Sequence, residues 1–249
     1  ASTAVGTDYG VATSATVVPV RVLDCTGSGY TSWIISGLDY IASYPLNGRR
    51  AVVNMSLGGG ASQSLNAAVA RLVAANIIVV AAAGNDSALA CDGSPAQESS
   101  AITVAATDSS DTRAWFSNYG SCVDLFAPGF DIVGAAISGT TASTHKSGTS
   151  MATPHVAGAA AIMATAWPAA SATSIANLII GDATPNLVSD AGEGSPNRLL
   201  MVSGTSLPVD TVPVTLKSVS PTRLFDTRTG IGGVPIQKVG GDYELQIQV

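Results

Sequence analysis

Residues 147–158, with the sequence SGTSMATPHVAG, join a polar loop to a stretch of small apolar residues that is typical of a buried helix. Ser150 falls in the first turn of that predicted helix, where unpaired backbone N–H groups and the positive end of the helix dipole favour a developing negative charge. A serine hydroxyl in this position could act as the nucleophile of an acyl transfer. The simpler interpretation is that Ser150 caps the helix, as serines at helix starts usually do.

Three segments that follow predicted strands could serve the same chemistry. Asn85 ends the run Ala81-Ala82-Ala83-Gly84-Asn85, and its amide could donate a hydrogen bond to an oxyanion, although an asparagine after glycine is more often a turn residue. Gly27-Ser28-Gly29 and Gly58-Gly59-Gly60 could let an extended peptide approach the backbone closely. Taken alone, these glycines are equally typical of ordinary turns.

The elements that would position these segments alternate along the chain. Apolar runs predict strands, and apolar residues at helical spacing predict the helices between them. This alternation predicts a parallel sheet that is covered by helices on both faces and binds ligands at the carboxyl ends of its strands. The predicted strands are 16–23, 51–57, 77–83, 101–106 and 122–126, and the predicted helices are 31–44, 64–75 and 173–180, with 131–137 leading into the Ser150 loop.

Composition narrows the class of protein. The chain has 249 residues, of which 46% are hydrophobic, so it can bury a large core, and its net charge is -6. Its largest basic cluster is the pair Arg49-Arg50, so we expect no nucleic-acid partner. The most apolar run, 156–167, is shorter than the roughly 18 residues that a membrane-spanning helix needs, and we expect no membrane span.

The chain has three cysteines, Cys25, Cys91 and Cys122. In a secreted protein this odd number leaves one thiol without a partner inside the chain. A Cys91–Cys122 pair would close a loop of about 30 residues and stabilise the fold by roughly 3–4 kcal/mol. Three reduced cysteines in a cytosolic protein are the alternative.

Residues 147–158 match the nucleophile signature of the subtilisin-like serine proteases at every position. Other segments resemble the proteinase K branch of that family in the same order along residues 1–202. The resemblance implies a three-layer α/β/α fold with a mainly parallel sheet, and a secreted serine endopeptidase that acts on protein or peptide substrates; we expect a monomer. The matching segments are VRVLD at 20–24, NMSLGGG at 54–60, AAGN at 82–85, FSNYG at 116–120 and DLFAPG at 124–129.

The resemblance also implies roles for individual residues. Ser150 would attack the scissile carbonyl, and the Asn85 side chain would form the oxyanion hole with the Ser150 N–H. Two segments would hold the substrate backbone, and a third would line an uncharged pocket for an apolar or aromatic side chain before the cut. The substrate-binding positions are Gly27, Ser28, Gly29, Ser56, Leu57, Gly58, Gly59, Ala82, Ala83 and Gly84.

Two structural features follow from the same resemblance. Cys91 and Cys122 match a family disulfide, and Cys25 matches a cysteine whose partner precedes Ala1 in the family. Asp124, with the carbonyls of Ser99 and Ala101, matches a structural calcium site. A carboxylate with carbonyl oxygens suits this hard cation, although Asp124 could equally be a solvated or hydrogen-bonded carboxylate.

The chain also departs from the family pattern. It contains no His-Gly-Thr-His-Val-Ala-Gly motif, the catalytic aspartate is absent, and neither His145 nor His155 matches the catalytic histidine. Because a general base must take the proton of Ser150, we expect no useful protease activity from this chain alone. The alternative is a non-catalytic protein that uses the same fold to bind peptides or surfaces.

The absent segment predicts a fold that is incomplete at its N-terminal side, with a sheet edge left bare. We assign residues 1–202 to the peptidase domain and residues 203–213, which contain Pro, Thr and Ser, to a linker. Residues 214–249 alternate apolar and polar side chains and predict the start of a β-rich C-terminal domain.

Overall fold

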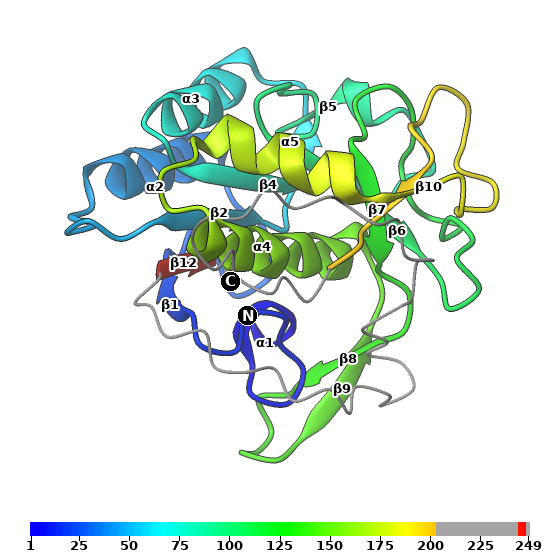
Figure 1. The fold of residues 1–249 in the computed structure, drawn as a ribbon, viewed down its shortest axis with the longest axis horizontal. Helices are drawn as coiled ribbons and strands as arrows, with labels where there is room; N and C mark the ends of the chain where they lie inside the picture. The colour runs from blue at the N-terminus through cyan, green and yellow to red at the C-terminus, as the bar shows by residue number, and fades with distance from the viewer. Residues whose placement is uncertain (203–243, 248–249) are drawn as a thin grey trace, which may run out of the picture.

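The computed structural model describes residues 1–202 and the backbone of residues 244–247. Its central element is an eight-stranded sheet in the order β1-β12-β2-β4-β6-β7-β11-β10, in which β10 and β11 form the antiparallel pair and the other pairs are parallel (Figure 1). These strands are β1 (Thr16–Pro19), β2 (Ala51–Met55), β4 (Ile78–Ala82), β6 (Ile102–Thr107), β7 (Leu125–Pro128), β10 (Thr184–Pro185), β11 (Arg198–Leu199) and β12 (Glu244–Ile247).

Helices cover both faces of this sheet, and two small strand pairs lie beside it. The helices are α1 (Ser2–Val5), α2 (Thr31–Ser43), α3 (Gln63–Ala74), α4 (Thr149–Ala166) and α5 (Ala172–Asp182), with a short 3-10 turn η1 (Ala90–Asp92). The small pairs are β3 (Gly59–Gly60) with β5 (Gly93–Ser94), and β8 (Ile132–Ala135) with β9 (Ser143–Lys146). The fold is therefore the predicted three-layer α/β/α arrangement.

The two-residue period of the strands explains the layers. Along β2, Val52 belongs to the apolar cluster that includes α4 and α5, whereas Val53 belongs to the cluster beneath α2 and α3. Every residue of β2 and β4 is buried, as expected for strands that are covered on both faces. The apolar runs at 51–57 and 77–83 thus predicted central strands correctly.

Helix α4 passes along one face of the sheet and is buried on nearly all sides (Figure 1). Its small residues allow close approach by neighbouring elements. A Cβ atom added at Gly158 would lie 2.6 Å from the Cβ atom of Val11. Because the helix is enclosed by α1, α5 and the sheet, its first turn is held firmly at the carboxyl edge of the strands.

The structure differs from the sequence prediction at several strand boundaries. Strand β1 ends at Pro19, because the following Val20 and Val22 pack against α2, where a Cβ atom at Gly37 would lie 2.6 Å from Val22 Cγ1. Strand β7 begins at Leu125, three residues later than predicted. The hairpin of β8 and β9 was not predicted, because only Ile132 among its residues is buried and the two strands do not alternate apolar with polar side chains.

Strand β12 lies between β1 and β2, inside the central sheet. Its register pairs Glu244 with Thr16 on one side and with Ala51 on the other. Four residues of the predicted C-terminal domain therefore complete the central sheet. The predicted linker at 203–213 and the rest of the predicted C-terminal domain lie outside the described residues.

Candidate active site

Ser150 is the second residue of α4, and Gly148 occupies the cap position, where no side chain caps the helix. The Ser150 hydroxyl donates to the Ser56 carbonyl oxygen at 3.2 Å. Helix capping therefore does not account for this serine. Its own N–H belongs to the first turn, whose N–H groups have no intrahelical acceptor and attract negative charge.

Ser56 is joined to Ser150 in both directions. While Ser150 Oγ donates to the Ser56 carbonyl, Ser56 Oγ donates to the Ser150 carbonyl at 2.8 Å. The buried Asn54 side chain donates from Nδ2 to Ser56 Oγ at 2.9 Å. Ser56 follows the carboxyl end of β2, so these contacts fix the first turn of α4 against that strand.

Asn85 follows β4 and is oriented by Thr149. Its Oδ1 atom accepts from the Thr149 N–H at 2.8 Å and from Thr149 Oγ1 at 3.0 Å. Because both donors reach the oxygen, the amide nitrogen Nδ2 is directed away from them and can donate elsewhere. The buried Thr149 side chain also accepts from the Gly84 N–H at 3.2 Å. Sequence reasoning gave Thr149 no role.

The Ser150 N–H and the Asn85 side-chain amide both lie near Gly148. A Cβ atom at this position would lie 3.6 Å from Ser150 N and 3.7 Å from both Nδ2 and Oδ1 of Asn85. Gly148 has φ of 154°, a conformation that disfavours other residues. Glycine thus keeps the space beside the Ser150 nitrogen and the Asn85 side-chain amide free of a side chain.

The loop that carries Asn85 is held by Asn118, another residue that sequence reasoning gave no role. Asn118 Nδ2 donates to the Ala83 carbonyl at 3.0 Å, and its Oδ1 atom accepts from the Asp86 N–H at 2.9 Å. Gly84 has φ of 105°, and a Cβ atom there would lie 2.3 Å from Asn118 Nδ2. The sequence signal for this loop was the glycine at position 84, between a predicted strand and Asn85; nothing in the sequence pointed to Asn118.

The structure places the predicted substrate-binding residues at 56–59 and 82–84 in different environments. Ser56 and Gly84 contact the nucleophile turn directly, through Ser150 and Thr149 respectively. Ala82 and Ala83 are buried, while Gly59 pairs with Ser94 in the β3–β5 ladder, and Leu57 and Gly58 link Ser56 to that ladder.

The turn Gly27-Ser28-Gly29 is held by Asp24. Asp24 Oδ1 accepts from Thr26 Oγ1 at 2.6 Å, from the Thr26 N–H at 2.8 Å and from the Ser28 N–H at 3.1 Å. These bonds, above all the one from the Thr26 hydroxyl, lower the pKa of Asp24. They are local to the turn, and none of them reaches Ser150.

Neither histidine takes the position of a base for Ser150. His145 Nδ1 lies 2.9 Å from Asp131 Oδ1 in the exposed β8–β9 hairpin. His155 is buried on α4, with Nδ1 2.9 Å from the Met151 carbonyl oxygen. The hydroxyl of Ser150 instead donates to a main-chain carbonyl, which is a far weaker base than imidazole.

Asp124 is mostly buried before β7, and its Oδ2 atom accepts from the Thr103 N–H at 2.7 Å. Burial raises its pKa from 3.8 to about 6, against the lowering effects of the Thr103 bond and of Arg198. A carboxylate is the kind of ligand that a hard cation prefers. Within residues 1–202 and 244–247, no three His, Cys, Asp or Glu side chains gather as a metal-binding cluster.

The cysteines occupy two different environments. Cys91 and Cys122 form a disulfide with an S–S distance of 2.10 Å and a Cα–Cα distance of 5.2 Å, as the resemblance implied. Cys25 is a free, exposed thiol, and Arg21 Nη2 lies 3.4 Å from its sulfur.

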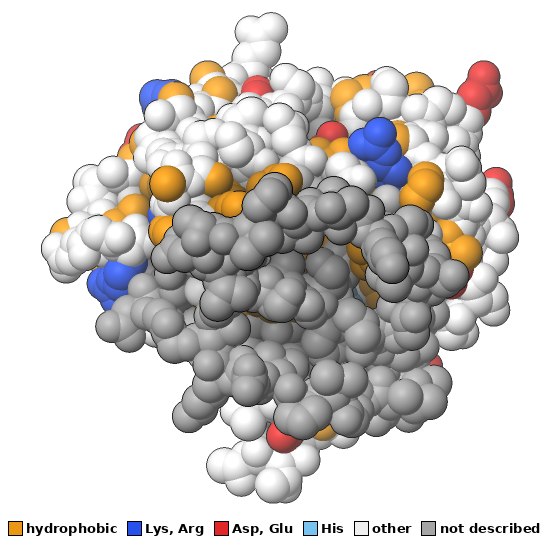
Figure 2. Space-filling view, viewed as in Figure 1, with side chains coloured by type: hydrophobic (Ala, Val, Ile, Leu, Met, Phe, Trp, Pro, Cys, Tyr) orange, Lys and Arg blue, Asp and Glu red, His pale blue; other side chains and the backbone are white. Residues whose placement is uncertain are grey.

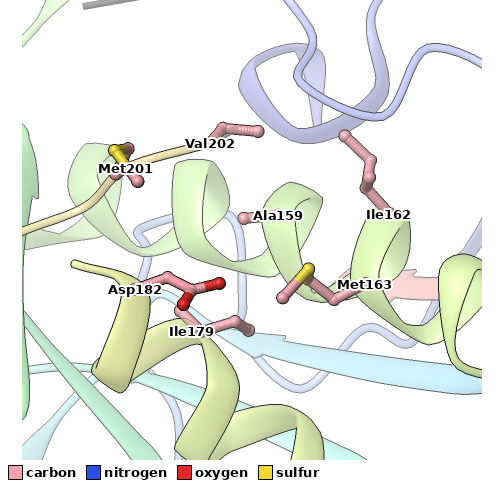
Figure 3. A pocket seen from close by; sticks show the side chains of 7 residues that line it. All are labelled: Ala159, Ile162, Met163, Ile179, Asp182, Met201 and Val202. Carbon is pink, nitrogen blue, oxygen red and sulfur yellow. The ribbon is translucent and has the colours of Figure 1, made fainter. Parts of the chain in front are cut away.

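A small pocket lies between α4 and α5, far along α4 from Ser150 (Figure 3). It has a volume of about 10 Å³, barely enough for one water molecule. It is lined by Ala159, Ile162, Met163, Ile179, Asp182, Met201 and Val202.

Among the described side chains that are visible in Figure 2, those of Lys and Arg lie apart from one another. None of the described helices is long and apolar enough to cross a membrane.

Fold and site together define an α/β protein in which a serine lies in the first turn of a buried helix, at the carboxyl edge of a mainly parallel sheet. The model of the subtilase family matches residues 1–202, and the chain belongs to that family. It is 53% identical over 200 residues to an extracellular serine proteinase of Thermus sp. (strain Rt41A), covering 80% of this chain and 48% of that protein. It is 46% identical over 200 residues to alkaline serine exoprotease A of Vibrio alginolyticus, covering 80% and 36%.

A solved structure supports the same fold assignment. A cold adapted subtilisin-like serine proteinase aligns with a TM-score of 0.77 and 45% identity, over 81% of this chain and 72% of that one. By contrast, the chain spans half or less of the length of the Thermus and Vibrio alginolyticus proteins.

Proposed function

We propose that this chain carries the nucleophile side of a serine endopeptidase that cleaves proteins or peptides through an acyl-enzyme at Ser150. The observation that carries the proposal is that Ser150 N and the Asn85 side-chain amide both lie beside Gly148, while Thr149 occupies Asn85 Oδ1 and leaves Nδ2 to donate. Donors that are fixed in advance stabilise the oxyanion of a tetrahedral intermediate. The printed names of the relatives, all proteinases or proteases, favour this reaction.

In this proposal the chain alone hydrolyses peptides poorly, because a base that accepts the Ser150 proton is lacking. Asn85 donates to the oxyanion, and Ser56 to Gly59 with Gly27 to Gly29 bind the substrate backbone. The chain acts as a monomer outside the cell, without nucleic acid. Calcium, held by Asp124 and the carbonyls of Ser99 and Ala101, would supply positive charge that stabilises the fold rather than the reaction.

A phosphonate or sulfonyl fluoride probe tests the chemistry. The purified chain should be labelled at Ser150 far more slowly than an active serine protease, and Ser150→Ala should abolish the label. Labelling at a normal protease rate would refute the absence of a base. A label located on another residue, as read by peptide mass spectrometry, would refute the assignment of the nucleophile.

A non-catalytic peptide-binding protein is the second candidate, favoured by the hydrogen bond from the Ser150 hydroxyl to a carbonyl instead of a base. The nucleotides upstream of the Ala1 codon distinguish the two candidates. An in-frame aspartate-bearing strand, a cysteine and a His-Gly-Thr-His motif support the endopeptidase. A start signal directly before Ala1 supports the binding protein.

A further inference from the structure

Pro154 changes the hydrogen bonding of the nucleophile turn. In a regular α-helix the N–H of residue 154 would donate to the carbonyl of Ser150, four residues earlier, but proline has no N–H. The Ser150 carbonyl accepts instead from Ser56 Oγ at 2.8 Å. A carbonyl left free by a proline is therefore satisfied by a hydroxyl from the neighbouring strand.

Asn54 orients that hydroxyl. Its Nδ2 atom donates to Ser56 Oγ at 2.9 Å, which leaves the hydroxyl hydrogen of Ser56 to point toward the Ser150 carbonyl. A serine hydroxyl has one hydrogen and rotates to suit its partners, so a fixed donor on one side selects its direction. The three groups thus form a directed chain from Asn54 through Ser56 to the backbone of Ser150.

Asn54 is costly as a purely structural residue. It is 1% exposed in a strand whose other four residues are Ala, Val, Val and Met, and its Oδ1 atom has no hydrogen-bond partner among the described residues. A buried polar atom without a partner costs about 1–3 kcal/mol. An apolar residue would fit this strand better, so the retained amide indicates a role for its other atom, Nδ2.

We propose that Asn54 and Pro154 are positioning residues for the nucleophile. Pro154 frees the Ser150 carbonyl, and Asn54 directs the Ser56 hydroxyl that binds it, so that the turn carrying Ser150 Oγ is tied to the end of β2. This inference rests on the proposed role of Ser150 as nucleophile, and it adds to Ser56 a task besides substrate binding. Sequence resemblance had placed Ser56 only in a substrate-binding segment.

The test is NMR of the full-length chain labelled with ¹³C and ¹⁵N, which does not depend on catalytic activity. Asn54→Leu and Ser56→Ala should each move the Ser150 carbonyl ¹³C resonance upfield, because its hydrogen bond is weakened or lost. Ser56→Thr keeps the hydroxyl and should retain the parent resonance. The matched control is Asn66→Leu on α3, which also removes an amide whose buried Oδ1 atom has no partner among the described residues; it should leave Ser150 unchanged.

Pro154→Ala separates positioning from general stability. The new N–H at residue 154 should bind the Ser150 carbonyl and exchange slowly with solvent, and Ser56→Ala in this background should no longer move the Ser150 resonance. If Asn54→Leu does not fold, the contrast between Ser56→Thr and Ser56→Ala decides whether the Ser56 hydroxyl binds the Ser150 carbonyl.

The proposal is overturned if Ser56→Ala leaves the Ser150 carbonyl resonance unchanged, or if Asn66→Leu moves it equally. It is also overturned if Ser56→Ala moves that resonance as much in the Pro154→Ala background as in the parent. Because the resting chain is observed, these outcomes are independent of whether the probe labels Ser150. A failure of the proposed endopeptidase function would therefore be seen separately.

Discussion

Replacing Asp124 by asparagine tests how much the buried negative charge of this carboxylate destabilises the fold. Without metal, burial raises the Asp124 pKa from 3.8 to about 6. At 1.36 kcal/mol per pKa unit, this difference corresponds to roughly 3 kcal/mol. Since the folded-state pKa is above the unfolded value, the stability that protonation contributes is fully present below about pH 4 and is lost as pH rises through about 6.

The amide side chain in the variant Asp124→Asn would be neutral at every pH and could still accept from the Thr103 N–H. In a chelator at pH 8 we therefore expect Asp124→Asn to be more stable than the parent by about 2–3 kcal/mol, or roughly 5–10 °C in Tm for a domain of this size. At pH 4 the two proteins should unfold alike. Urea and thermal unfolding followed by circular dichroism at pH 4, 6 and 8 measure both quantities.

Calcium at 100 times its Kd should abolish this difference in stability at pH 8. A cation at 100 times its Kd stabilises the parent by about 2.7 kcal/mol, and the variant, which lacks the carboxylate, should gain little. Asp92→Asn, an exposed change of the same charge, is the control and should shift stability by less than about 0.5 kcal/mol. A variant less stable than the parent in chelator at pH 8 would refute the argument from burial; no response of the parent to calcium would refute only the metal site.

Three further predictions concern other parts of the fold. Gly148→Ala should cost about 1–3 kcal/mol in urea unfolding, because the residue has φ of 154°; an unchanged midpoint would show that the turn relaxes freely. Leu245→Pro removes a ladder donor from β12 and should speed hydrogen exchange in β2 (Ala51–Met55), whereas Leu245→Val, which keeps the N–H, should not; equal exchange in both would show that β12 does not complete the sheet. Cys91→Ser with Cys122→Ser should lose about 3–4 kcal/mol and make thermal unfolding insensitive to reductant, unlike the parent.

Burial patterning made the central sheet predictable. The run at 77–83 is apolar throughout, and the run at 51–57 is apolar except for Asn54 and Ser56, because both faces of β2 and β4 are covered. Such runs identify strands without reference to partners. The start of α4 was predictable from the change from polar to small apolar residues. The 122–126 prediction was less accurate, because Cys122 is held in a disulfide and the strand begins only at Leu125.

Strand β12 shows the limit of local patterning. Alternation at its residues predicted a strand correctly, but alternation carries no information on which strand it pairs with. The register of Glu244 with Thr16 and Ala51 joins residues about 190 or more positions apart. Such pairing depends on which edge is open in the folded sheet, and a sequence pattern does not specify that.

The side chains that orient the site were hidden for a related reason. Thr149 and Asn118 act through hydrogen bonds to residues 64 and 35 positions away, respectively. Threonine and asparagine are common in turns and caps, so neither residue type identifies such a bond. The same holds for Asn54, whose amide stands out only once burial shows that its strand is otherwise apolar.

The hydrogen bond of the Ser150 hydroxyl shows that its proton is bound to a main-chain carbonyl and not to a side-chain base. The two donors beside Gly148 are placed for negative charge, and Ser56 ties the nucleophile turn to the sheet. The hydroxyl proton, however, points to the Ser56 carbonyl oxygen, which is too weak a base to remove it. A base that completed the site would have to accept this proton in place of that carbonyl, while the Ser56 hydroxyl bond to the Ser150 backbone could remain. In the proposed function, stabilisation of the oxyanion and removal of the proton are therefore separable, and the described residues offer groups only for the first.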